Sequence, residues 1–137
     1  MSGKRFHISN ISIGSNLGNR YKFIESAIEE IRKIPSKILK SSKILETKAL
    51  DFTNQPDFLN CIIQIETDLT ALELLDSLQS IEKRLGRVKR FDKGPREIDL
   101  DILTFDQEVV NESRLTIPHH SVQTRPFIKE LLIDIEN

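Results

Sequence analysis

The segment at residues 57–67 constrains the fold of this chain most, because its side chains alternate with the period of a β-strand. One face of the strand would carry an apolar set: Leu59, Cys61, Ile63 and Ile65. The opposite face would carry a mixed set: Phe58, Asn60, Ile62 and Gln64. The alternation predicts a strand that packs its first face on a core and presents an aromatic ring and an amide on the second.

Two helices are predicted from apolar residues that recur at helical spacing. The first spans about residues 19–34, ends before Pro35 and carries one apolar stripe: Phe23, Ile24, Ala27, Ile28, Ile31 and Ile34. The second begins at Thr70, because Thr70 and Glu73 form the T-x-x-E pattern of a capping box. It would turn another apolar set inward before Gly86 ends it: Leu74, Leu75, Leu78, Ile81 and Leu85.

Further strands are predicted at residues 8–13, 37–47 and 98–105, a small hairpin at 109–110 and 115–117, and a C-terminal helix at 126–135. The resulting order is strand, helix, strand, strand, helix, strand, which is that of the ferredoxin-like split βαβ motif. We therefore predict an α+β fold, with a ferredoxin-like βαββαβ antiparallel sheet, helices on one face, a small hairpin and a C-terminal helix. The length predicts one domain over residues 1–137.

Composition excludes several classes of function. The net charge is -1, so the surface as a whole is no footprint for nucleic acid. We find neither a run of roughly 20 apolar residues that could span a bilayer nor a secretory signal. The single cysteine, Cys61, is compatible with a reducing compartment. The sequence thus predicts a cytoplasmic protein without membrane or nucleic-acid partners.

The charged residues between positions 83 and 101 give the strongest functional signal. Basic side chains crowd this segment, with Asp92 alone opposing them: Lys83, Arg84, Arg87, Lys89, Arg90, Lys93 and Arg96. Asp99 and Asp101 follow at once, and on a strand they would share one face with Cα atoms about 6.5 Å apart. Two carboxylates on one face repel each other, and a divalent cation such as Mg²⁺ would remove that repulsion.

Each half of this signal is ambiguous alone. A pair of aspartates is at least as often the solvated face of an edge strand, and a basic run is usually a solvated connector. Arg96, however, lies three residues before Asp99 and offers a planar fork that matches phosphate oxygens. Phosphoryl transfer relies mainly on positioning and positive charge. The juxtaposition therefore favours phosphate binding beside a magnesium site, although the sequence lacks both the P-loop and the protein-kinase motifs.

The run Gly94-Pro95-Arg96-Glu97-Ile98-Asp99-Leu100-Asp101-Ile102 closely resembles the signature of the 6-hydroxymethyl-7,8-dihydropterin pyrophosphokinase family of folate biosynthesis. The resemblance covers nearly the whole chain, including residues 13–18, 55–60, 79–88 and 115–119. It implies transfer of pyrophosphate from ATP to the hydroxymethyl group of a reduced pterin, which gives AMP and the pterin diphosphate. It also implies two Mg²⁺ ions, a monomer, and a functional link to the next enzyme of the pathway.

The resemblance assigns roles to individual residues. The catalytic set would be Arg87, Arg96, Asp99 and Asp101, with Asp99 and Asp101 holding both metal ions. The set that contacts ATP would be Gln79, Glu82, Arg87, Arg96, Ile102, His119 and Arg125. The pterin pocket would be formed by Thr47, Leu50, Phe58, Asn60 and Phe127. Phe58 and Phe127 would stack on the two faces of the pterin ring.

The chain departs from the family pattern at several positions. Lys93 stands where many members carry a Trp before the Gly-Pro-Arg run, and the chain has no Trp at all. Lys48 and Ala49 stand in place of a frequent pair of prolines, and His120 in place of a frequent Tyr.

Two functions of other classes remain open to test. A ferredoxin-like RNA-binding module would stack bases on exposed aromatic residues of its sheet, but here Phe58 alone could do so, and the exposed residues of the last strand are acids that would repel phosphate. A ligand-binding regulatory domain without catalysis is the other alternative. Incubation with ATP, magnesium and the reduced pterin separates them, because only the pyrophosphokinase would form AMP in a pterin-dependent way.

Overall fold

The structure is a computed structural model that describes residues 6–49, 54–88, 90 and 94–136. Its main sheet is antiparallel and contains β1 (His7–Ser15), β2 (Ser36–Ser41), β3 (Leu45–Thr47), β4 (Phe58–Thr67) and β5 (Asp99–Phe105). The strand order is β2-β4-β1-β5. β3 also pairs with β4, at residues 58–60, whereas β2 pairs with residues 63–67 of that strand. This order and the α+β composition confirm the predicted ferredoxin-like fold.

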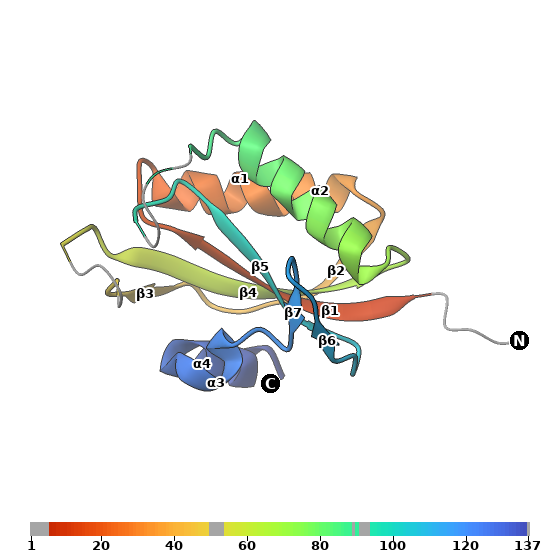
Figure 1. The fold of residues 1–137 in the computed structure, drawn as a ribbon. Coiled ribbons are helices and arrows are strands. Elements are labelled where there is room, and N and C mark those ends of the chain that lie inside the picture. The colour runs from red at the N-terminus through yellow and green to blue at the C-terminus, as the bar shows by residue number, and fades with distance from the viewer. Residues whose placement is uncertain (1–5, 50–53, 89, 91–93, 137) are drawn as a thin grey trace, which may run out of the picture.

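Two helices, α1 (Arg20–Lys33) and α2 (Ala71–Arg84), cover one face of the sheet (Figure 1). The predicted capping box is confirmed, because the Glu73 N–H donates to Thr70 Oγ1 at 3.2 Å and the Thr70 N–H donates to Glu73 Oε1 at 2.9 Å. Gly86, with φ of 98°, lies just past the end of α2. The apolar stripes of both helices pack on the predicted core face of β4.

The opposite face of the sheet carries α4 (Pro126–Glu136), which follows the short helix α3 (Ser121–Thr124) (Figure 1). A second, smaller core forms there: Ile62, Leu103, Ile128, Leu131 and Ile135. The two short strands β6 (Val110–Asn111) and β7 (Thr116–Ile117) pair as the predicted hairpin. Because α4 covers only part of this face, side chains at the ends of β1, β4 and β5 remain accessible beside it.

One strand prediction was only partly right. Residues 37–47 form two strands instead of one, separated at Ser42. The Ser42 N–H donates to the Ile62 carbonyl and the Ile62 N–H donates to Ser42 Oγ, both at 2.8 Å. The hydroxyl thus takes the place of a backbone carbonyl in the ladder, which interrupts the strand and still satisfies β4.

Within the described part of the chain, no helix combines the length and the apolar character that crossing a membrane requires.

Candidate active site

Two cavities open on the sheet and meet at its edge. The large cavity has a volume of about 790 Å³ and lies between α2, β5 and the β6–β7 hairpin. The small cavity has a volume of about 230 Å³ and lies between the ends of β1, β3 and β4 and the start of α4. Their linings share one set of residues: Arg96, Asp99, Asp101, His119 and His120. Charged groups are therefore concentrated where the two cavities join.

Strand register brings the shared carboxylates to this junction. Gly14 on β1 pairs with Asp99 on one side and with Asn60 on the other, and Ser12 pairs with Asp101. A Cβ atom at Gly14 would lie 3.1 Å from Asn60 Oδ1 and 3.7 Å from the Phe58 ring. Because Gly14 has no side chain, the floor of the small cavity stays open next to the carboxylates of Asp99 and Asp101.

Two guanidinium groups bracket Asp99. Arg87 Nη1 donates to Asp99 Oδ1 at 3.1 Å, and Arg96 Nη1 donates to Asp99 Oδ2 at 2.9 Å. Arg87 Nη1 also donates to Glu82 Oε2 at 2.7 Å, and the same oxygen accepts the Leu100 N–H at 2.8 Å. Burial raises the pKa of Glu82 to about 7, although the Leu100 N–H and Arg87 both favour its ionised form.

Asp101 lies on the same strand face as Asp99, as predicted. Its side chain keeps 37% exposure toward the cavities. Burial of the Asp101 carboxyl raises its pKa most, and the negative charges of Asp99 and Glu82 raise the pKa further. An oxygen donor pair whose charges repel each other at a cavity junction fits a hard divalent cation such as Mg²⁺.

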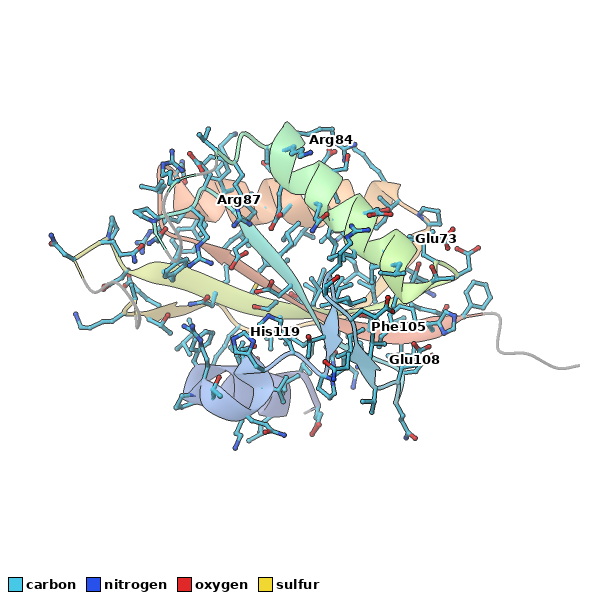
Figure 2. The ribbon with its side chains drawn as sticks, in the orientation of Figure 1. Glu73, Arg84, Arg87, Phe105, Glu108 and His119 are labelled. Carbon is cyan, nitrogen blue, oxygen red and sulfur yellow. The ribbon has the colours of Figure 1, made fainter. Side chains whose placement is uncertain are left out.

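His119 faces this carboxylate from the segment before α3. Its Nδ1 accepts the Ser121 N–H at 3.1 Å, so the neutral ring carries its proton on Nε2. Nε2 lies 3.8 Å from Asp101 Oδ1, and burial, followed by the charge of His120, lowers the pKa of His119. In Figure 2, Arg87 lies on the side of α1 and α2, and His119 lies on the side of α3 and α4. Donors thus approach the junction from both faces of the sheet.

The small cavity brings together the residues predicted to bind the pterin. Asn60 Nδ2 donates to Thr47 Oγ1 at 2.7 Å, which fixes the amide and turns its carbonyl oxygen toward Gly14. Phe58 and Phe127 both line this cavity. The Arg96 guanidinium carbon lies 5.4 Å from the centroid of the Phe58 ring, within cation–π range. Leu50, which was also predicted here, lies outside the described residues.

The structure distributes the remaining predicted residues between the cavities. Gln79, Glu82, Arg87 and Ile102 line the large cavity. Arg125, which the resemblance assigned to ATP, lines the small cavity and is absent from the lining of the large one. Its assignment to the nucleotide therefore stays a prediction.

Several residues of the site were missed from the sequence. Arg114 lines the large cavity from the β6–β7 hairpin, and its Nη2 donates to Asp76 Oδ1 at 2.6 Å and to Gln79 Oε1 at 3.2 Å. Nothing in the sequence marks this isolated cation beyond its place in the segment between two short strands. Asn16, which is 1% exposed, was also missed. Its Nδ2 donates to Gln55 Oε1 at 2.7 Å and to the Pro56 carbonyl at 3.1 Å.

Comparisons with known proteins identify the family. The family model described as 7,8-dihydro-6-hydroxymethylpterin-pyrophosphokinase (HPPK) matches residues 10–137. A 2-amino-4-hydroxy-6-hydroxymethyldihydropteridine pyrophosphokinase of Aquifex aeolicus is 40% identical over 126 residues, which cover 92% of this chain and 78% of the relative. The folic acid synthesis protein of Pneumocystis carinii is 49% identical over 125 residues, which cover 91% of this chain but 17% of that longer protein.

Among solved structures, the Plasmodium falciparum HPPK-DHPS with pterin and p-hydroxybenzoate is similar in fold, with a TM-score of 0.76. The match covers 98% of this chain and 39% of that chain, at 15% sequence identity. At this identity the likeness supports the fold alone.

Proposed function

This chain belongs to the 7,8-dihydro-6-hydroxymethylpterin-pyrophosphokinase family, and on that premise we propose how its cavities and residues carry out the reaction. The reaction is the transfer of pyrophosphate from ATP to the hydroxymethyl group of 6-hydroxymethyl-7,8-dihydropterin, in folate synthesis. The proposal assigns ATP to the large cavity and the pterin to the small one. It rests on one observation above all: the two cavities share Arg96, Asp99, Asp101 and His119, so two ligands would meet at a charged junction.

The chemistry requires such a meeting point. The pterin hydroxyl oxygen attacks the β-phosphorus of ATP, the bond from that phosphorus to the α–β bridging oxygen breaks, and AMP leaves while the hydroxyl proton is lost. Positioning and positive charge account for most of the catalysis in transfers of this kind. Arg96 and His119 at the junction, together with Arg87 on the side of the large cavity, supply donors on both sides of the transferred group.

Asp99 and Asp101 would hold magnesium at the junction, and we propose two Mg²⁺ ions, as the family resemblance implies. When bound, the metal would neutralise charge on the phosphate oxygens. Both oxygens of Asp99 already accept hydrogen bonds from Arg87 and Arg96. A metal ion on Asp99 would compete with the two guanidinium groups for these oxygens, and a guanidinium that gives up its bond would become available to the phosphates that arrive with the metal. Holding Arg87 and Arg96 on Asp99 keeps them next to the place where they act.

Nucleotide contacts would come from Gln79, Glu82, Ile102 and His119, with Arg125 as a further candidate from the small cavity. The Nε2–H of His119 points toward Asp101 and would donate to a phosphate oxygen beside it. Arg114 adds a cation to the same cavity and orients the Gln79 amide.

The pterin would lie between the rings of Phe58 and Phe127, because offset stacking on aromatic faces suits a flat heterocycle. Asn60, held by Thr47, would read the polar edge of the pterin with its amide. Arg96 stacks near Phe58 and donates to Asp99, and it therefore connects the pterin pocket with the phosphates.

We further propose that the protein acts as a cytoplasmic monomer without nucleic-acid or membrane partners. A functional link to the next folate enzyme is supported by relatives in which the matching region is a small part of a longer folate-synthesis protein.

The test is an incubation of the protein with ATP, Mg²⁺ and 6-hydroxymethyl-7,8-dihydropterin, followed by anion-exchange separation of the nucleotides. The proposal predicts AMP and pterin diphosphate in equal amounts, no AMP without the pterin, and none after chelation of the metal. Formation of ADP or orthophosphate in place of AMP would overturn it. Absence of AMP in a mixture where a known family member is active would do the same and leave the regulatory domain as the better reading.

A further inference from the structure

The ion pair Arg90–Glu97, whose residues are not among the predicted site residues, links the two ends of the basic segment. We call these ends, residues 87–90 and residues 94–97, its two arms. Arg90 Nη1 donates to Glu97 Oε1 at 2.8 Å, and Arg90 Nη2 donates to Glu97 Oε2 at 2.6 Å. The backbone of Val88 takes part on both sides, because its N–H donates to Glu97 Oε1 at 3.4 Å and its carbonyl accepts Arg90 Nη1 at 3.3 Å. One carboxylate thus binds both the side chain of Arg90 and the main chain of Val88.

The geometry distinguishes this pair from the other ion pairs on the surface. An ordinary exposed pair contributes about 0–1 kcal/mol, because water and side-chain entropy offset the attraction. Here the guanidinium binds the carboxylate through two parallel N–H groups, the arrangement that is strongest and most specific in direction. The Glu97 side chain is 15% exposed and that of Arg90 33% exposed, so neither is freely solvated. The pair therefore fixes a position as well as balancing charge.

The pair fixes the position of the two arginines that are predicted to contact phosphate. Arg87 lies just before Val88, and Arg96 lies just before Glu97. Each of them donates to one oxygen of Asp99. The Arg90–Glu97 pair holds together the two arms from which these guanidinium groups project. Asp99 and the ion pair thus constrain the separation of the two arginines at two points.

We propose that Glu97 is a positioning residue of the pyrophosphate transfer: through Arg90 and Val88 it sets the distance between Arg87 and Arg96 at the cavity junction. The inference rests on the proposed function. Arg90 lines the large cavity, but both of its terminal nitrogens donate to Glu97, and we assign it the role of anchor for Glu97 rather than that of a third phosphate donor. Misplacement of Arg87 and Arg96 would weaken the stabilisation of the transferred pyrophosphate group in the transition state more than it weakens the binding of ATP.

The test combines steady-state kinetics of E97Q, R90M and the double variant with amide hydrogen exchange measured without substrates. R90M keeps an unbranched apolar stem without the guanidinium, and residue 90 lies at the surface, so this variant should fold even if E97Q is less stable. We expect kcat to fall about tenfold or more in each single variant, with KM for ATP within about threefold of the wild type. The double variant should be no slower than the worse single variant, because the two residues act as one unit. The Arg96 amide should exchange faster in all three.

A matched control is the Arg84–Glu30 pair, whose Nη2–Oε1 distance is 3.0 Å and which lies outside both cavities. Figure 2 shows Arg84 at the outer end of α2. R84M and E30Q should leave kcat and the exchange of Arg96 unchanged.

Three results would overturn the inference: wild-type kcat in R90M, losses that multiply in the double variant, or a loss confined to KM for ATP, which would make Arg90 a direct phosphate ligand. If the wild-type protein forms no AMP, the proposed function fails by itself. The exchange of Arg96 then still decides whether the pair positions it, since unchanged rates in E97Q and R90M would contradict that role.

Discussion

Asn16 and Arg96 exchange two hydrogen bonds, although they are 80 residues apart in the sequence. The Asn16 N–H donates to the Arg96 carbonyl at 3.1 Å, and the Arg96 N–H donates to Asn16 Oδ1 at 2.8 Å. The same amide donates through Nδ2 to Gln55 and Pro56. The buried side chain of Asn16 therefore joins the end of β1 to the segment before β4 and to the backbone of Arg96, an arginine that is predicted to contact phosphate.

We expect Asn16→Ala to lower both stability and turnover. It leaves a polar backbone group unsatisfied at Arg96, which costs about 1–3 kcal/mol for each buried group. Thermal unfolding gives the change in stability, and kcat measured well below the unfolding temperature gives the change in catalysis. Asn10→Ala is the matched control, because Asn10 is the same residue type, lies on β1 itself, and its side chain makes one long bond of 3.4 Å to Gln64. Equal effects of the two substitutions would show that Asn16 has no special role.

Asp101→Asn should uncouple activity from stability. Removal of a metal ligand is expected to lower turnover by at least about a hundredfold. The folded protein should be no less stable without metal, because a neutral amide avoids both the burial of a charge and the repulsion with Asp99, which together raise the pKa of Asp101. Turnover at saturating Mg²⁺ and the unfolding temperature in a chelator are the two measurements. Asp68→Asn, at an exposed position, is the control. Near-normal turnover in Asp101→Asn would remove this residue from the metal site.

The raised pKa of Glu82 makes the stability of the protein depend on pH. Its pKa rises from 4.5 in the reference state to about 7 in the fold, chiefly through burial, so the folded state binds this proton more tightly than the unfolded state. Its contribution is fully present below pH 4.5 and is lost as the pH rises through 7. The unfolding temperature of Glu82→Gln minus that of the wild type should therefore increase between pH 5 and pH 8.

Glu25→Gln, at an exposed position on α1, provides the baseline for that comparison. A Glu82→Gln difference that stays constant or decreases toward pH 8 would mean that Arg87 and the Leu100 N–H outweigh burial at this carboxylate.

Local sequence patterns were sufficient for most elements of the fold, but not for the short helix α3 or for the division of residues 37–47 into two strands. The alternation in 57–67 and the capping box at Thr70 identify β4 and α2, because each pattern reports a nearby physical requirement: two faces of a strand, and unsatisfied N–H groups at a helix start. The break at Ser42 could not be predicted in this way. It depends on a hydroxyl that reaches across to Ile62 on another strand, and no local spacing encodes that contact.

The same distinction applies to the site. Asp99, Asp101 and Arg96 lie close together in the sequence, so their charge pattern is visible without a fold. Asn16, Arg114 and Glu97 contribute through partners that only the folded chain brings near, such as Arg96 for Asn16 and Gln79 for Arg114. Glu97 was within the recognised signature, yet its role depends on the bidentate contact with Arg90, which is a property of geometry.

The assignment of the two cavities is tested most directly by calorimetric titration of Phe127→Ala with the reduced pterin and, separately, with a non-hydrolysable ATP analogue and Mg²⁺. Phe127 lines the small cavity and is absent from the lining of the large one. Stacking on one aromatic ring is worth about 1–3 kcal/mol, so pterin affinity should fall roughly tenfold or more while nucleotide affinity changes less than about twofold. Phe6→Ala, at an exposed ring that lines neither cavity, should change neither. Equal losses for the pterin and the nucleotide in Phe127→Ala would contradict the account.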